Sequence, residues 1–159
     1  MIIANLSLFF SYAKARVIEA PHDVDRKSNG NTLICTTTFG EMFSHIGRNN
    51  DQEPLAPGDE KHRIIEVDSN GEIVWEIIGL GIPHEVEELP SGHILIADTN
   101  YDKVIEINYP NKDIVWSWEP KLINWTAVNP KWDSAHYYNN PLVYDFTHVN
   151  DVDFYQYNS

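Results

Sequence analysis

The 159-residue sequence has one cysteine, few basic residues and no long apolar run. The single cysteine, Cys35, excludes a disulfide within the chain. No stretch approaches the roughly 20 apolar residues that a membrane-spanning helix needs. Only 11 Lys and Arg stand against 24 Asp and Glu, which gives a net charge of -13. A surface this acidic repels phosphate backbones and anionic lipids, so neither nucleic acid nor membrane is expected as a partner.

Several signatures of cofactor and nucleophile chemistry are missing as well. The sequence has no Gly-rich phosphate loop, no Cys/His zinc spacing and no G-x-S-x-G elbow. We therefore expect neither a cofactor nor a metal. Cys35 follows Leu33 and Ile34 in an apolar run, where a small buried side chain is more common than a nucleophile.

The sequence does contain one pattern that occurs twice in the same order. The segment Pro21–Asp25, PHDVD, returns as Pro83–Glu87, PHEVE. Three further matched blocks follow each copy: 30–34 with 92–96, 63–67 with 103–107, and 72–75 with 113–116. Four matches in one order indicate a repeated structural unit.

Each block is short, β-branched and apolar, and turn residues such as Asn29 and Gly30 separate the blocks, as in hairpins. A four-strand repeat with a period of about 40 residues is typical of a propeller blade. The expected fold class is all-β: a partial β-propeller of two four-stranded antiparallel blades plus the first strand of a third. The predicted strands cover 22–27, 31–38, 63–69 and 72–77, then 84–89, 93–99, 103–108 and 113–118.

The predicted organisation has five parts, because two long irregular stretches interrupt the repeat. They are an N-terminal apolar segment over 1–15, a first blade over 16–81 with an insertion over 40–62, a second blade over 82–118, an aromatic-rich insertion over 119–146, and the start of a third blade over 147–159. A propeller closes its ring with about four or more blades. We expect either a fragment of a longer protein, which we favour, or self-association through open blade edges.

The first residues leave the location of the protein open. Met1–Phe10 is apolar, and Ala13–Ala15 resembles the small-residue site at which a secretory signal is cleaved. No Lys or Arg precedes Ser11, however. The alternative is a strand, either on its own or as the edge of a preceding blade.

The repeat places histidines at one end of the predicted channel. The first strand of a blade lines the propeller axis, so His22, His84 and His148 are expected around the channel mouth, on the face from which both insertions emerge. Imidazoles near one axis suit proton transfer, nucleophilic catalysis or metal binding. The alternative is a structural bracket, in which each ring is bonded to a neighbouring loop.

The third unit departs from the pattern at this position. His148 is followed by Asn150, a side chain that orients a neighbour or donates to an oxyanion. If the histidines align, Asn150 corresponds to Val24 and Val86. In a second register, which matches more residues, Asn150 takes the place of the repeated histidine and His148 lies two residues upstream. Both registers stay open.

Other residues are weaker candidates. Asp98 ends a predicted strand and is expected to be a solvated carboxylate. His93 occupies a turn on the opposite face. Three further groups complete the set. The histidines of the insertions are expected at the surface, and the tryptophans of the outer strands are expected to pack between blades. The aromatic residues of the late insertion are expected either to form a lid or to pack simply within their loop. The three groups are, in this order, His45, His62 and His136; Trp75, Trp116 and Trp118; and Trp125, Trp132, Tyr137 and Tyr138.

Over residues 16–118 and 147–153 the sequence resembles the arylsulfotransferase-like propeller family. The resemblance rests on the blocks PHDVD, GNTLI, RIIEVD and GEIVWE, and on THVNDVD, which is similar to the family's T-H-x-N-x-V segment. NHL and quinoprotein-like propellers share the repeat blocks more loosely. The H-x-N segment is the more specific part.

The resemblance implies a six-bladed enzyme, often exported to the periplasm, that moves a sulfuryl group from a phenolic sulfate to another phenol. No nucleotide cofactor is needed, because a channel histidine is transiently sulfated while His, Asn and Arg side chains hold the sulfate oxygens. His148 and Asn150 match the H-x-N segment, and His22 and His84 are candidates for the other histidine roles. The family's arginine and remaining blades are absent from these 159 residues, so the isolated chain is expected to be inactive.

Two functional hypotheses follow. The first is a sulfotransferase-like enzyme, or part of one, that acts on small phenolic substrates through His148, Asn150, His84 and His22. The second is a non-catalytic propeller scaffold that binds a protein or small ligand on its loop-rich face. The directions and partners of the histidine side chains distinguish the two.

Overall fold

The computed structural model describes residues 19–38, 62–135 and 146–155. The predictions for His45, His136, Tyr137 and Tyr138 lie outside these residues, as do those for the segment 1–15 and most of the insertion 40–62. No helix among the described residues is long and apolar enough to cross a membrane.

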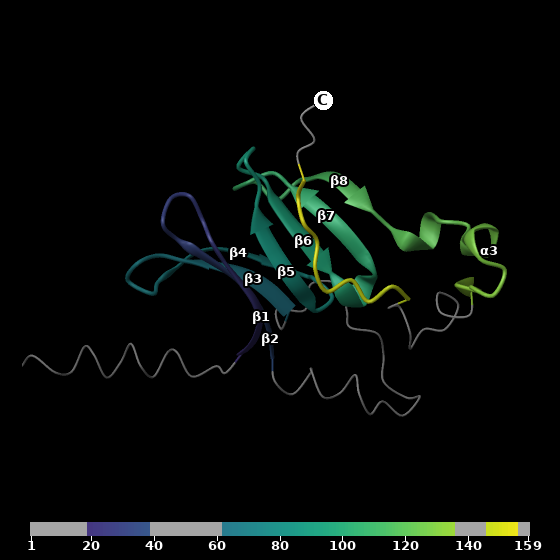
Figure 1. Cartoon of the computed structure of the whole chain (residues 1–159). Helices are drawn as coiled ribbons and strands as arrows, with labels where there is room; N and C mark the ends of the chain where they lie inside the picture. Colours follow the sequence, from purple (N-terminus) through teal and green to yellow (C-terminus); the bar gives the residue numbers. More distant parts are fainter. Residues whose placement is uncertain (1–18, 39–61, 136–145, 156–159) are drawn as a thin grey trace, which may run out of the picture.

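The described chain forms two four-stranded antiparallel sheets, each a simple meander (Figure 1). Blade 1 consists of β1 (Glu19–Arg26), β2 (Thr32–Thr38), β3 (His62–Val67) and β4 (Ile73–Ile78). Blade 2 consists of β5 (Pro83–Glu88), β6 (Ile94–Asp98), β7 (Lys103–Ile107) and β8 (Ile114–Trp118). Each of the eight strands predicted for the two blades overlaps an observed one, so the partial propeller is confirmed, although residues 146–155 contain no regular strand.

Equivalent strand pairs have the same irregularity at the repeated histidine. In β1, Pro21 pairs with Thr36 and Asp23 with Cys35, so His22 is an extra residue. In β5, Pro83 pairs with Asp98 and Glu85 with Ala97, so His84 is an extra residue in the same way. A β-bulge of this kind turns the side chain of the extra residue away from the regular alternation of the strand. The two bulges explain how both histidines leave the sheet faces.

The main core lies between the two blades. Leu33, Cys35 and Ile64 of blade 1 are fully buried against blade 2. The blade 2 side of this core is aliphatic: Val86, Ile94, Ile96, Ile105 and Ile107. Burial also raises the pKa of the Cys35 thiol, which fits the predicted role of Cys35 as a small hydrophobic residue.

The third-unit segment, residues 146–155, lies beside β5 and against the other face of blade 2 (Figure 1). The Asp102 carboxylate accepts hydrogen bonds from the backbone N–H (2.9 Å) and the hydroxyl of Thr147. The Thr99 hydroxyl donates to the carbonyl of Val149. Val149 and Val152 pack on a small cluster formed by Leu89, Leu95 and Val104. The segment therefore takes the place of the first strand of a third blade.

Short helices lie between and after the strands of blade 2. The 3-10 helix η1 (Thr99–Tyr101) joins β6 to β7, whereas the 3-10 helix η2 (Pro120–Leu122) and the helix α3 (Trp125–Val128) follow blade 2 and belong to the second insertion. The Trp125 ring contacts the rings of Trp132 and Phe146. Its Nε1 donates to the carbonyl of Pro120 at 2.8 Å. These contacts correspond to loop packing, the simpler of the two roles expected for Trp125 and Trp132.

Candidate functional site

Acidic side chains connect each inner strand to the next. The Asp23 carboxylate accepts a hydrogen bond from the backbone N–H of Val86 at 3.1 Å, and that of Asp25 accepts one from Glu88 at 3.1 Å. The Glu85 carboxylate accepts the backbone N–H of Val152 in the same manner. These bonds occupy backbone donors that the ladders of the two sheets leave without partners.

The connecting bonds fix the register of the third unit. Asp23 bonds to Val86, and its repeat equivalent Glu85 bonds to Val152. Val152 is therefore equivalent to Val86, and Asn150 occupies the position that His84 has in blade 2. Of the two registers compatible with the sequence, the structure has the one in which His148 lies two residues upstream.

Three imidazoles and one amide meet beside the two bulges. The rings of His22 and His84 are stacked, with centroids 4.4 Å apart and planes 14° apart. His148 meets His84 edge-on, with centroids 5.4 Å apart and an angle of 88°. The His84 Nδ1 lies 2.5 Å from the Asn150 Oδ1. All four predicted site residues thus form one cluster, although they come from three repeat units.

Asn150 sets the proton arrangement of His84. An amide oxygen only accepts, so Nδ1 of His84 is the donor in the 2.5 Å contact. The amide nitrogen of Asn150 donates to the carbonyl of His148 at 3.2 Å, which holds the oxygen toward the ring. In the neutral ring the lone pair then lies on Nε2 of His84. Asn150 therefore orients an imidazole whose second nitrogen is basic and nucleophilic.

His22 has a more enclosed environment than its neighbours. Its Nε2 atom is buried and has no hydrogen-bond partner among the residues that the structure describes. Burial, followed by the proximity of His84, holds the pKa of His22 below its usual value. A neutral His22 stacked on His84 adds no positive charge beside it at neutral pH.

His148 is the exposed histidine of the cluster. Its backbone has a φ of 48°, in the left-handed region that residues with a β-carbon seldom adopt. The third-unit segment therefore bends immediately before the inner-strand position at Asn150. This bend brings the His148 ring to the edge of His84 instead of into the repeat position.

Two weaker candidates differ from expectation. Asp98 is fully buried instead of solvated, because its Oδ1 accepts the backbone N–H of Gly81 at 2.6 Å and Lys103 lies 3.5 Å from Oδ2. Burial raises the pKa of Asp98 to about 6. His62 is the first residue of β3 instead of part of the insertion, and it is fully buried with a bond to Thr37.

Three of the remaining outer residues, His93, Trp75 and Trp118, follow their expected roles, whereas Trp116, which was expected between blades, is 49% exposed. His93 lies in its turn, away from the cluster, and its Nδ1 is 2.6 Å from Glu106. Trp75 packs on the core between the blades, and its Nε1 donates to the carbonyl of Pro110 in blade 2. Trp118 packs on the second cluster together with Val152.

The acidic connectors are the functional feature that the sequence reasoning missed. Their signal was present, because acidic residues recur at alternate positions after the repeated His or Asn of each unit: Asp23 and Asp25, Glu85 and Glu87, Asp151 and Asp153. Among the described residues, no group of three His, Cys, Asp or Glu side chains is placed to hold a metal ion. The cluster is thus a set of imidazoles with an amide.

Comparisons with known proteins give fold neighbours only. No family model matches the sequence, and no curated protein matches it. A protein of unknown function from Bacteroides caccae is 17% identical, with a TM-score of 0.43, over 64% of this chain and 29% of that chain. A catalytically inactive virginiamycin B lyase from Staphylococcus aureus, solved with quinupristin, is 14% identical, with a TM-score of 0.32, over 66% of this chain and 43% of that one. The chain thus spans less than half the length of either structure.

Proposed function

We propose that the cluster of His22, His84, His148 and Asn150 is a site of sulfuryl transfer between phenols, with His84 as the nucleophile. The observation that carries the proposal is the 2.5 Å contact between His84 Nδ1 and the Asn150 amide oxygen. It leaves the lone pair on Nε2, which is the arrangement that a nucleophilic imidazole needs. The resemblance to arylsulfotransferase-like propellers supplies the substrate class.

The proposed first step forms a nitrogen–sulfur bond. Nε2 of His84 attacks the sulfur of an aryl sulfate, the bond between sulfur and the aryl oxygen breaks, and a protonated His148 gives its proton to the leaving phenolate. Nδ1 of His84 keeps its proton through Asn150, so the sulfated ring is cationic and is a good leaving group. The imidazole thereby divides one displacement into two easier ones.

The proposed second step restores the protein. The oxygen of an acceptor phenol attacks the sulfur, the nitrogen–sulfur bond breaks, and the phenol proton returns to His148. His22 stacks on the reacting ring and limits its rotation. The buried, neutral state of His22 keeps the electron pair of His84 from being withdrawn by a second positive charge.

The test follows the first step, because turnover is not expected from these 159 residues alone. The chain is incubated with 4-nitrophenyl sulfate, and nitrophenol release and peptide masses are measured. We expect one sulfuryl group on the peptide that contains His84, less of it in Asn150→Ala, and no change in His93→Ala, which removes a histidine away from the cluster. Absence of the adduct, or equal labelling in His84→Ala, would contradict the proposal.

One observation favours a second candidate, a non-catalytic scaffold. The contact between His84 and Asn150 also ties the third-unit segment to β5, as a structural bracket does. In that case His84→Ala would loosen the segment, and the wild-type chain would neither bind an aryl sulfate nor become labelled by it. Protection of the 147–155 amides from hydrogen exchange measures the loosening separately from the chemistry.

A further inference from the structure

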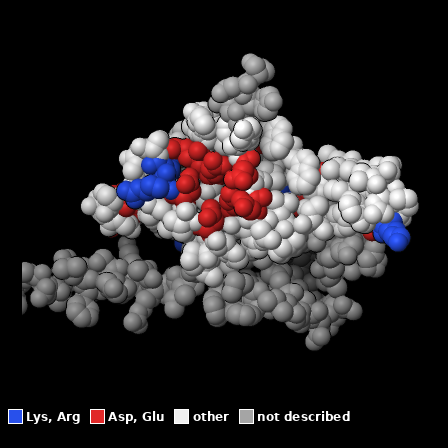
Figure 2. All heavy atoms as spheres, in the orientation of Figure 1, with Lys and Arg blue, Asp and Glu red and all other residues white. Residues whose placement is uncertain are grey.

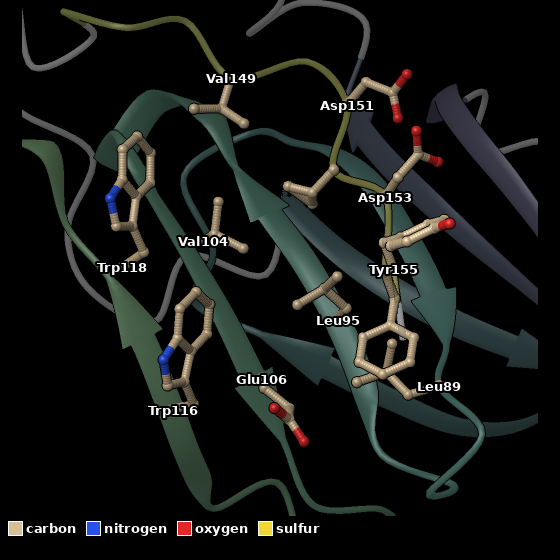
Figure 3. Close-up of a pocket in the computed structure, with 12 residues that line it drawn as sticks. Leu89, Leu95, Val104, Glu106, Trp116, Trp118, Val149, Asp151, Asp153 and Tyr155 are labelled. Atoms are coloured by element: carbon tan, nitrogen blue, oxygen red, sulfur yellow. The ribbon is translucent and has the colours of Figure 1, made fainter. Parts of the chain in front are cut away.

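The outer face of blade 2 carries an open apolar cleft of about 580 Å³ (Figure 3). Leu95, Val104, Trp116 and Trp118 form its blade 2 side, and the third-unit segment borders it on the other. Figure 3 shows the two tryptophans side by side on β8, with Asp151 and Asp153 pointing away from them. Trp116 is 49% exposed, an unusual environment for a large aromatic side chain in a sheet.

The repeat identifies this cleft as an interface between blades. Leu95 is equivalent to Leu33, Val104 to Ile64, and Trp116 to Trp75. In blade 1 those equivalents pack against blade 2: Leu33 and Ile64 are completely buried and Trp75 is partly buried on the same core. One surface therefore occurs twice in the molecule, once covered by a sheet and once open.

The third-unit segment covers only part of the surface on blade 2. Val152 of the segment occupies on blade 2 the position that Val86 occupies on blade 1. Val152 packs there on Leu95 and its neighbours. Blade 2 also covers blade 1 with Ile96, Ile107 and the other isoleucines of β6 and β7. No described residue of the third unit corresponds to those strands, which leaves the cleft beside the segment.

The free end of blade 1 has the matching features. Val24 is equivalent to Val86, yet it is 57% exposed where Val86 is 1% exposed. No described residue precedes β1 to supply the acidic connectors that Asp23 and Asp25 supply to β5. The β1 end of blade 1 is thus one side of an interface between blades, and the open face of blade 2 is the matching side.

Charge favours the same pairing. Glu87 lies near Asp25 and Asp153, and Glu85 near Asp23 and Asp151. Figure 2 shows Asp and Glu atoms gathered in one patch, with Lys and Arg atoms at its border. Directly after the second acidic residue of the repeat, β1 carries Arg26, where the third-unit segment carries Phe154. Seating β1 on blade 2 would bring a cation to the carboxylates.

We propose that the β1 end of a second copy of this chain docks on the cleft face of blade 2, in the register in which blade 2 docks on blade 1. The backbone groups of Val24 and Arg26 then meet Glu85 and Glu87, and the Val24 side chain lies against Leu95. Because β1 and the third-unit segment fit one site, the segment yields its place when the second copy binds. The contact joins unlike faces, so it continues into a ring or an open chain.

Sedimentation of the full chain over a range of concentrations tests the proposal. We expect wild type to associate as concentration rises, and Val152→Asp, which weakens the segment, to associate at least tenfold more readily. Trp116→Glu and Val24→Glu should each remain monomeric, since each removes one of the two faces. Val115→Glu is the matched control, because Val115 is 50% exposed on the same strand but does not line the cleft.

Mixing the two defective variants gives the sharpest outcome. A head-to-tail contact retains one intact pair of faces, so equal amounts of Trp116→Glu and Val24→Glu should form a dimer and nothing larger. A mixture that stays monomeric would overturn the proposal, as would a wild type and a Val152→Asp that are monomeric throughout. Association of Trp116→Glu alone to the wild-type extent would also overturn it. Circular dichroism confirms that each variant is folded.

Discussion

The covered face of blade 1 and the open face of blade 2 are built from equivalent residues but differ in their polar rim. On blade 1, Lys27 and Glu66 form a buried ion pair at 2.8 Å, and Lys27 lies 3.4 Å from the centre of the Tyr109 ring of blade 2. On blade 2 the equivalents are Leu89 and Glu106, and Glu106 contacts the partly exposed His93. The repeat specifies each sheet, whereas the neighbouring blade determines which charges become buried.

The buried pair requires its full set of partners. Burial alone would raise the pKa of Glu66, but hydrogen bonds from Lys27, Asn31, Tyr109 and Asn29 outweigh it and lower the pKa. The amide of Asn31 donates to Glu66 at 2.6 Å. An ion pair this enclosed is stable only when hydrogen bonds occupy the remaining atoms. Tyr109 belongs to blade 2, so the ion pair of Lys27 and Glu66 depends on the contact between the blades.

The largest effect is expected from breaking this pair. Glu66→Gln removes the nearer counter-charge of the buried Lys27 ammonium and leaves only Glu88, at 3.8 Å, so it should lower the free energy of unfolding by about 3–5 kcal/mol. The equivalent change on the open face, Glu106→Gln, affects a partly exposed contact and should cost about 1 kcal/mol or less. Urea unfolding of both variants measures the difference. Equal losses would show that the two rims have the same energetics in solution.

A smaller contrast is expected at the apolar centre of the same surfaces. Leu33→Ala empties a closed core and should cost about 2–5 kcal/mol, because the cavity has no access to solvent. Leu95→Ala enlarges a cleft that is already open, so we expect about half that loss. Unfolding midpoints at a fixed protein concentration give both values. A larger loss for Leu95→Ala would mean that the cleft is filled in solution.

Much of this fold follows from the sequence, because each strand carries its own local signals. Asn29 and Gly30 form a turn in which Gly30 has a φ of 89°, as hairpin chemistry predicts. The repeat also located His22 and His84 correctly on equivalent strands. The repeat did not predict the bulges, because the change of pairing around His22 depends on where β2 lies beside β1.

The site itself was only partly predictable. His148 and Asn150 were recognised as a departure from the repeat, but the two registers were separable only through the bond from Val152 to Glu85. The burial of Asp98 depends on Gly81 and Lys103, which lie 17 residues before it and at the start of the next strand. Contacts of this kind carry no local signature in the sequence.

A third contrast concerns pH. Glu85 is the acidic connector between blade 2 and the third-unit segment, next to the open face. Burial raises its pKa from 4.5 to about 7, and the Asp151 and Asp23 side chains add to the shift. Between these two values the unfolded chain is ionised while folded Glu85 retains its proton, so stability falls as pH rises through this range and levels off above about 7.

The variant Glu85→Gln isolates that contribution. It should flatten the fall in unfolding free energy between pH 5 and 7 without abolishing it, because Asp98, with a pKa of about 6, titrates in the same direction. Urea unfolding at several pH values measures both curves. A Glu85→Gln curve as steep as that of wild type would assign the whole dependence to Asp98 and other groups.

The smallest effect is expected at the contact that the proposed site and the open face share. His84 and Asn150 join β5 to the third-unit segment through one hydrogen bond, and such a bond contributes about 0.5–1.5 kcal/mol. A double-mutant cycle of His84→Ala and Asn150→Ala should return a coupling energy in that range. Hydrogen bonds to Thr99, Asp102 and Glu85 and the packing of Val149 and Val152 on blade 2 also hold the segment. Zero coupling would mean that the segment leaves β5 in solution, which would remove Asn150 from the imidazole cluster and the proposed chemistry with it.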